Sequence, residues 1–198
     1  MTNAPGGPPR RLLHTRRIAC EAFMREDGLI DIEGVLVDTK PRPFKIATKT
    51  VEADHPIHLM RLCLTINTAR EILGIRASSE QTPYNECREV EPQYQRLIGL
   101  RIDSGFTRTV KQMFAGAQGC THMTELLPTI ATTAFQVIWS ENGWQGVSPP
   151  GNPKRKSPID GCHALRADGH VVRTYFQHHL ENREGEADAQ AAPPRDPV

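Results

Sequence analysis

The sequence predicts an α+β fold, in which an antiparallel sheet from the N-terminal half is covered on one face by C-terminal helices. Period-two alternation of apolar residues dominates Leu13–Ile75, in segments rich in Ile, Val, Leu and Thr. From Glu91 onward the apolar spacing lengthens to that of helices. At 198 residues the chain is close to the usual size of one domain. We therefore expect one domain at 13–180, between polar, proline-bearing disordered tails at 1–12 and 181–198.

Each element follows from its local pattern. Strands are predicted for three alternating segments, HTRRIACEAFMRE (14–26), GLIDIEGVLVDTK (28–40) and IHLMRLCLTINT (57–68). Helices are predicted for PQYQRLIGL (92–100), TRTVKQMFAG (107–116) and the long segment HMTELLPTIATTAFQVIWS (122–140). Pro128 is either tolerated in the first turns of the long helix or kinks it. The segment HVVRTYFQHH (170–179) fits a strand or a helix.

Composition excludes several classes of function. The net charge is +1, and Lys and Arg are spread along the chain, so we expect no nucleic-acid partner. No apolar run approaches the roughly 18 residues of a membrane span, and the N-terminus lacks the apolar segment of a secretory signal. Five cysteines, an odd number without an export signal, favour free thiols or metal ligands over disulfides. The sequence predicts a soluble, cytoplasmic protein with a small-molecule substrate and no membrane partner, and it is compatible with a homo-oligomer.

Ionisable residues stand at one end of the apolar faces of the three predicted strands. Because alternate side chains share a face, Asp38 and Lys40 continue the apolar face of the second strand, while Asp31 lies on its other face. His14 and His58 begin the apolar faces of the first and third strands. This pattern is expected where a sheet closes over a pocket with polar groups at its mouth, although strand ends also lie near solvent without any function. We take these five residues as catalytic candidates, with His58 as the natural base near neutral pH.

A Cys-x-His pair, Cys120 and His122, stands where a glycine-bearing loop is predicted to become a helix. Two ligands do not make a zinc site, so others must come from elsewhere in the chain. The predicted metal ligands are Cys87, Cys120, His122 and Cys162, with His58 as the alternative to Cys162. Two other interpretations stay open. Cys120 is a nucleophile at the positive end of the helix, or it is a structural thiol beside a capping histidine.

Several motifs together resemble a bacterial family of unknown function, DUF2889. The motifs lie between His14 and Val172 and are HTRRIACEAF, REDGLIDIEGVLVDTK, PIHLM, TPYNEC, LIGLRI, GCTHMTELL, TTAFQ and CHAL. The family name transfers no activity. The resemblance nevertheless picks out the same His, Cys and Asp residues, and so favours a catalytic or metal centre over a packing pattern. It also suggests that the substrate belongs to the catabolism of aromatic or acyl compounds.

These observations lead to one main hypothesis and two alternatives. The main hypothesis is a small hydrolase or lyase in which a divalent metal, zinc, polarises a substrate oxygen or activates water. Its substrate would be an apolar, aromatic or acyl catabolic intermediate, with Asp31, Asp38 and Lys40 in acid–base or supporting roles. The first alternative is a metal-free acyl transferase or thioesterase that uses Cys120. The second is a non-enzymatic ligand-binding module with a structural metal.

Overall fold

The computed structural model describes residues 7–141 and 159–176, apart from the side chains at positions 139 and 141. Half of the predicted N-terminal tail and all of the predicted C-terminal tail lie outside these ranges. The predicted domain at 13–180 spans parts of two compact units, Met1–Ile138 and Trp139–Val198. Each unit is described by itself below.

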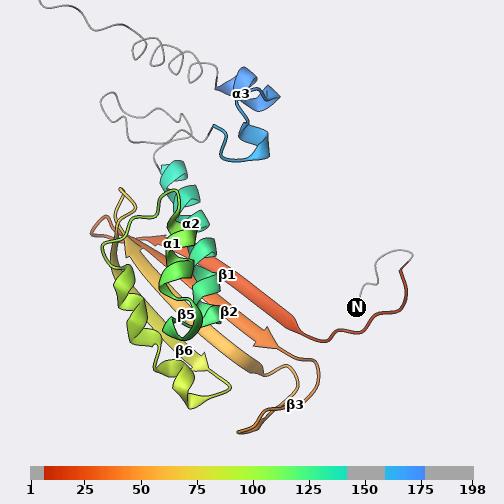
Figure 1. Ribbon diagram of the computed structural model, residues 1–198. Coiled ribbons are helices and arrows are strands. Elements are labelled where there is room, and N and C mark those ends of the chain that lie inside the picture. The colour runs from red at the N-terminus through yellow and green to blue at the C-terminus, as the bar shows by residue number, and fades with distance from the viewer. Residues whose placement is uncertain (1–6, 142–158, 177–198) are drawn as a thin grey trace, which may run out of the picture. The chain divides into compact units, whose positions relative to one another are not determined.

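The first unit is built on a four-stranded antiparallel sheet with the strand order β1-β2-β5-β6 (Figure 1). Together with helices in the C-terminal half, this sheet confirms the α+β class. The three predicted strands are present, and β6 adds a fourth that the sequence pattern had not delimited. The strands of this sheet are β1 (Thr15–Met24), β2 (Ile30–Thr39), β5 (Pro56–Ile66) and β6 (Ile72–Gln81). A small hairpin between β2 and β5 pairs β3 (Phe44–Lys45) with β4 (Thr50–Val51).

The alternation of β2 explains which face of the sheet is covered. Ile30, Ile32 and Leu36 are buried, whereas the residues of the opposite parity between them are half-buried. Gly34 belongs to the buried row, and a Cβ atom added there would lie 2.8 Å from Cδ1 of Ile130. The absence of a side chain at Gly34 therefore lets a helix lie directly on β2.

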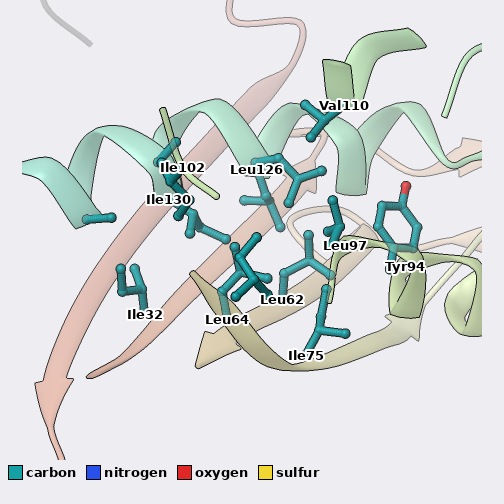
Figure 2. Packing of buried hydrophobic residues seen from close by; sticks show 14 of the residues in the cluster. Ile32, Leu62, Leu64, Ile75, Tyr94, Leu97, Ile102, Val110, Leu126 and Ile130 are labelled. Atoms are coloured by element: carbon teal, nitrogen blue, oxygen red, sulfur yellow. The ribbon is translucent and has the colours of Figure 1, made fainter. Parts of the chain in front are cut away.

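Helices cover this one face of the sheet and form the core with it (Figures 1 and 2). The predicted long helix is α2 (Thr121–Glu141), with Pro128 inside it, and the second predicted short helix is α1 (Phe106–Met113). The first predicted short helix is a 3₁₀ helix, η2 (Glu91–Leu97). Shorter 3₁₀ turns are η1 (Asn85–Arg88) and η3 (Gly116–Gln118). Core side chains labelled in Figure 2 are Ile32, Leu62, Leu64, Ile75, Tyr94, Leu97, Ile102, Val110, Leu126 and Ile130.

The described part of the second unit is short and mainly helical. It contains η4 (His163–Leu165) and α3 (His170–Tyr175). The segment that fitted a strand or a helix is therefore helical as far as Tyr175, and its last three residues lie outside the described ranges. A small cluster of buried side chains holds these turns together, formed by Ile159, Val172 and Phe176.

Candidate functional site

Three neighbouring strands place polar side chains in one row on the helix-covered face of the sheet. Arg16 of β1 lies opposite Asp38 of β2, and Asp38 lies opposite His58 of β5. Immediately after Asp38 the pairing of β2 with β5 shifts register. Asp38 and His58, which parity placed at the ends of apolar faces, therefore meet, because the strand register aligns those ends.

Asp38 is the centre of this row, and its side chain is only 1% exposed. Arg16 donates two parallel hydrogen bonds to the carboxylate, from Nε to Oδ1 and from a terminal nitrogen to Oδ2, both 2.8 Å long. His14 Nε2 lies 3.0 Å from Oδ1. Burial by itself raises the pKa of Asp38, but the hydrogen bonds from Arg16 and His14 outweigh it and hold the pKa well below its usual range. The carboxylate is therefore ionised at neutral pH.

Two imidazoles approach the same carboxylate oxygen of Asp38. His58 Nδ1 lies 3.0 Å from Oδ2, and His122 Nε2, from the first turn of α2, lies 3.5 Å from it. The two rings stack with their centroids 3.8 Å apart. Burial lowers the pKa of both histidines, with partial compensation from Asp38 at His58 and a further decrease from the charge of His58 at His122. Both imidazoles are therefore mainly neutral at pH 7.

Cys120 lies directly before α2 and faces His122 from the other side of its ring. The Cys120 Sγ atom is 3.7 Å from His122 Nδ1. Tyr94 fixes the backbone of Cys120, because its hydroxyl accepts a hydrogen bond from the amide (3.1 Å) and donates one to the carbonyl (2.9 Å). Tyr94 is completely buried, so the start of α2 is attached to the core.

The geometry groups three side chains that could hold a metal ion. One ligand atom each from Asp38, His58 and His122 lies within 4.8 Å of the other two, and this is the one such cluster among residues 7–141 and 159–176. Neutral imidazole nitrogens and an ionised carboxylate are ligands that zinc and other divalent transition metals accept. Without a metal, the same groups could act as a carboxylate-oriented histidine base.

The structure places the other predicted site residues differently. Asp31 is at the opposite end of β2, about 23 Å along the strand, where it accepts a hydrogen bond from Thr65. The ammonium group of Lys40 lies over the ring of Phe44. Cys87 lies in η1 and is outside the ligand cluster.

The predicted metal set is thus not the one that the structure brings together. Of its four members, only His122 belongs to the cluster, while Cys120 lies beside it. Cys162 is an exposed residue of the second unit, which is described by itself. The other two cluster residues, Asp38 and His58, were predicted as catalytic groups, and His58 was also predicted as the alternative to Cys162 among the metal ligands. The difference arises because turn-forming neighbours marked the cysteines, whereas strand register decides which side chains meet.

Two residues of the site were not among the sequence-based candidates. Arg16 binds Asp38, and Glu125 forms an ion pair with Arg16 at 2.5 Å. Arg16 shares the parity of His14, so its position on the same face was visible in the sequence. Glu125 follows His122 by three residues, a spacing that places both on one side of a helix.

The family comparison agrees with the motifs described above. A family model described as "Protein of unknown function (DUF2889)" matches residues 14–136, which is more than half of the chain. The chain belongs to the DUF2889 family. The match includes every residue of the candidate site described above, from His14 to Glu125, while the CHAL motif lies beyond it. No curated protein and no solved structure matched the chain.

The DUF2889 match gives no activity by itself, so the chemistry rests on the site. Among the described residues, no helix of this DUF2889 protein has the length and apolar character needed to cross a membrane.

The lowered pKa values of the two histidines predict a loss of stability in mild acid for metal-free protein. Because His58 and His122 bind protons less readily in the folded chain, the unfolded chain takes up more protons as the pH falls below about 6.5. The free energy of unfolding should be highest above that pH and decrease below it, by up to about 1.4 kcal/mol per pH unit for each proton. Urea denaturation in a chelator at pH 7.5 and 5.5 measures the change. The variant His122→Gln should reduce this difference in unfolding free energy between the two pH values. The variant His55→Gln, at an exposed histidine, should leave the difference unchanged.

Proposed function

We propose that Asp38, His58 and His122 bind a divalent metal ion, zinc in the first place, and that the protein is a metal-dependent hydrolase or lyase. One observation carries this proposal. Two imidazole nitrogens from different elements approach a single oxygen of a buried, ionised carboxylate, at 3.0 and 3.5 Å.

These distances suit ligands of one ion. Zinc binds imidazole nitrogen and carboxylate oxygen at about 2.0–2.2 Å. Two such ligands lie roughly 3.0–3.5 Å apart when the angle at the metal is between square and tetrahedral. The spacing from Oδ2 of Asp38 to the nitrogens of His58 and His122 falls in this interval. These two distances are compatible with one ion, and the two imidazole nitrogens lie within 4.8 Å of each other.

One of the two tautomers of His122 leaves room for a cation at this point. A nitrogen without a proton that faces a carboxylate oxygen places two lone pairs against each other, which is unfavourable. A neutral imidazole has one proton, so His122 cannot donate to both Cys120 and Asp38. If Nδ1 of His122 donates to the sulfur, Nε2 is left to accept a bond from a cation beside Oδ2. A metal ion satisfies both atoms.

The surrounding groups resemble the outer partners that orient metal ligands. Cys120 lies where it fixes the tautomer of His122, and His14 and Arg16 hold the carboxylate of Asp38. The positive charge of Arg16 opposes a dication, and its ion pair with Glu125 reduces that opposition.

Three protein ligands are the number typical of catalytic zinc, because they leave a coordination position for water or substrate. When bound, the metal would supply a Lewis acid that polarises a substrate oxygen or activates water. His14 is 40% exposed beside the carboxylate, so it can exchange protons with a substrate. The aromatic or acyl nature of the substrate stays a prediction from the sequence.

Metal binding by variants of the two histidines tests the proposal. After loading with zinc and removal of the excess, untagged protein should hold about one equivalent by elemental analysis, as three protein ligands for one ion require. His58→Ala and His122→Ala should each reduce this to below about a tenth of an equivalent, because two remaining ligands do not hold zinc tightly.

The matched control is His55→Ala, which removes an exposed histidine close to His58 in sequence. This variant should keep the full equivalent. Less than a tenth of an equivalent in the loaded parent protein, or zinc binding that survives both site variants, would contradict the metal centre.

A second function is favoured by the position of Cys120. Its sulfur is 3.7 Å from His122 Nδ1, directly before the N-terminus of α2. Without metal, His122 could accept the thiol proton, and the thiolate could attack an acyl carbon while the leaving group departs with that proton. This arrangement corresponds to a cysteine-dependent acyl transferase or thioesterase.

Alkylation of the cysteines separates the two functions. A nucleophilic Cys120 should be labelled completely by iodoacetamide near neutral pH, with the same rate before and after a chelator. Cys63 serves as the internal reference, because burial and the nearby charge of Asp31 raise the pKa of its thiol to about 11, and it should stay unlabelled. Peptide mass spectrometry locates the label. A Cys120 that is as unreactive as Cys63 in metal-free protein would exclude the thiol mechanism.

A further inference from the structure

The two outer strands of the sheet differ in whether side chains bind the backbone groups along their outer edges. Along β6, side chains bind the backbone groups that face away from β5. Glu91 accepts a hydrogen bond from the amide of Ser79, Arg88 donates to the carbonyl of Ser79, and Gln95 donates to the carbonyl of Ile75. This edge is closed by the segment that contains η1 and η2.

The opposite edge is formed by β1, which pairs with β2 alone among the described strands. It is ten residues long and contains no proline or lysine, two residues that commonly protect an edge. Ile18, Phe23 and Met24 are 40%, 48% and 54% exposed. A long edge with exposed apolar side chains is a template for another strand.

We propose that β1 pairs with β1 of a second copy of this chain, antiparallel, about a two-fold axis that passes through Ala19. Ala19 is close to the middle of the strand, so the pairing runs from Thr15 to Phe23. The two sheets then form one continuous sheet of eight strands, and the open edge is removed.

The side chains of β1 select this register. A two-fold axis perpendicular to the sheet places opposite each other only residues that share a face. Arg17 and Glu21 share the face that the helices leave uncovered, and both are exposed. With the axis at Ala19, Arg17 lies opposite Glu21 of the partner subunit, and symmetry repeats the pair.

The same two residues lack charged partners within the described chain. Neither Arg17 nor Glu21 forms an ion pair with residues 7–141 or 159–176. Glu21 even lies opposite Glu33 of β2, and like charges facing each other across strands are destabilising. Glu33 already has Arg76 at 3.9 Å, so Arg17 of the partner subunit would supply the positive charge that Glu21 lacks.

Charge reversal tests the register. In sedimentation velocity the parent chain should have twice the 22.1 kDa mass of the monomer. Arg17→Glu or Glu21→Arg places like charges opposite each other twice, so each should raise the Kd of the dimer by about tenfold. The double variant restores both pairs with their signs exchanged and should return to within about threefold of the parent. Arg108→Glu makes the same charge change on α1 and should have no effect.

A cross-link tests the axis itself. In a Cys162→Ser background, Ala19→Cys should form a disulfide between subunits under copper–phenanthroline, because the two residues face each other across the axis. Ala117→Cys, at an exposed position in η3, should not. A monomeric parent chain would overturn the proposal. A dimer that the charge variants leave unchanged, or that Ala19→Cys does not cross-link, would overturn this register.

Discussion

Replacing Asp38 by asparagine should abolish stoichiometric zinc binding and lower the free energy of unfolding by about 3 kcal/mol. Breaking a fully buried ion pair costs about 3–5 kcal/mol, because the remaining charge has no partner. Arg16 keeps 35% of its side chain exposed and can turn to water, so we expect the lower end of that range. Chemical denaturation of metal-free protein and elemental analysis of zinc-loaded protein measure the two effects.

Asp31→Asn is the matched control for this change. It makes the same substitution in the same strand, at a carboxylate that is 17% exposed and bonded to Thr65. We expect full zinc binding and a loss of about 1 kcal/mol or less. If Asp31→Asn removed the metal and Asp38→Asn did not, the site would have been placed at the wrong end of β2.

Replacing Gly119 by alanine should lower the free energy of unfolding by about 1–3 kcal/mol and weaken zinc binding. A Cβ atom there would meet the Cβ atom and carbonyl oxygen of Phe114 at 2.5 and 2.8 Å. Phe114 cannot move freely, because its ring stacks on Tyr94 with centroids 4.4 Å apart. Tyr94 holds the backbone of Cys120 at the start of α2, so the strain should reach His122. Calorimetric zinc titration and urea denaturation test both consequences.

Gly74→Ala provides the comparison for this variant. Its added Cβ atom would lie 3.5 Å from Cβ of Thr65, which is an ordinary van der Waals contact. We expect a change within about 0.5 kcal/mol and an unchanged zinc affinity. Equal effects at Gly74 and Gly119 would show that crowding by Phe114 does not decide the outcome.

The sheet and its helical cover could be predicted because both patterns are local. Alternation located β1, β2 and β5, and apolar spacing located α1 and α2. The pattern of β6 was weaker, since Gly74 and Ser78 interrupt it, and β5 supplies the pairing that makes it a strand. The apolar residues of η2 have the spacing of an α-helix, yet the segment forms a 3₁₀ helix. A proline lies in its first turn.

The site was only partly visible in the sequence. Parity had placed Asp38 and His58 on apolar faces, and it had already separated Asp31 from Asp38. What parity cannot show is the register between strands, which aligns Arg16, Asp38 and His58. The docking of α2 brings His122 to this row from more than 60 residues away in sequence.

The cysteines and the strands indicated different sets of ligands. Neighbouring turn residues selected Cys87 and Cys162, but a turn shows only that a residue is near the surface. Asp38 is buried with four basic side chains aimed at it, and carboxylates whose pKa is so strongly shifted are found preferentially at functional sites.

Anomalous scattering at the zinc edge, from one crystal of untagged, zinc-loaded protein, tests the metal centre most directly. The proposed site predicts one strong peak within about 2.0–2.2 Å of a carboxylate oxygen of Asp38 and of one nitrogen each of His58 and His122. A peak held by Cys87 or Cys162, or the lack of any peak near Asp38, would contradict it.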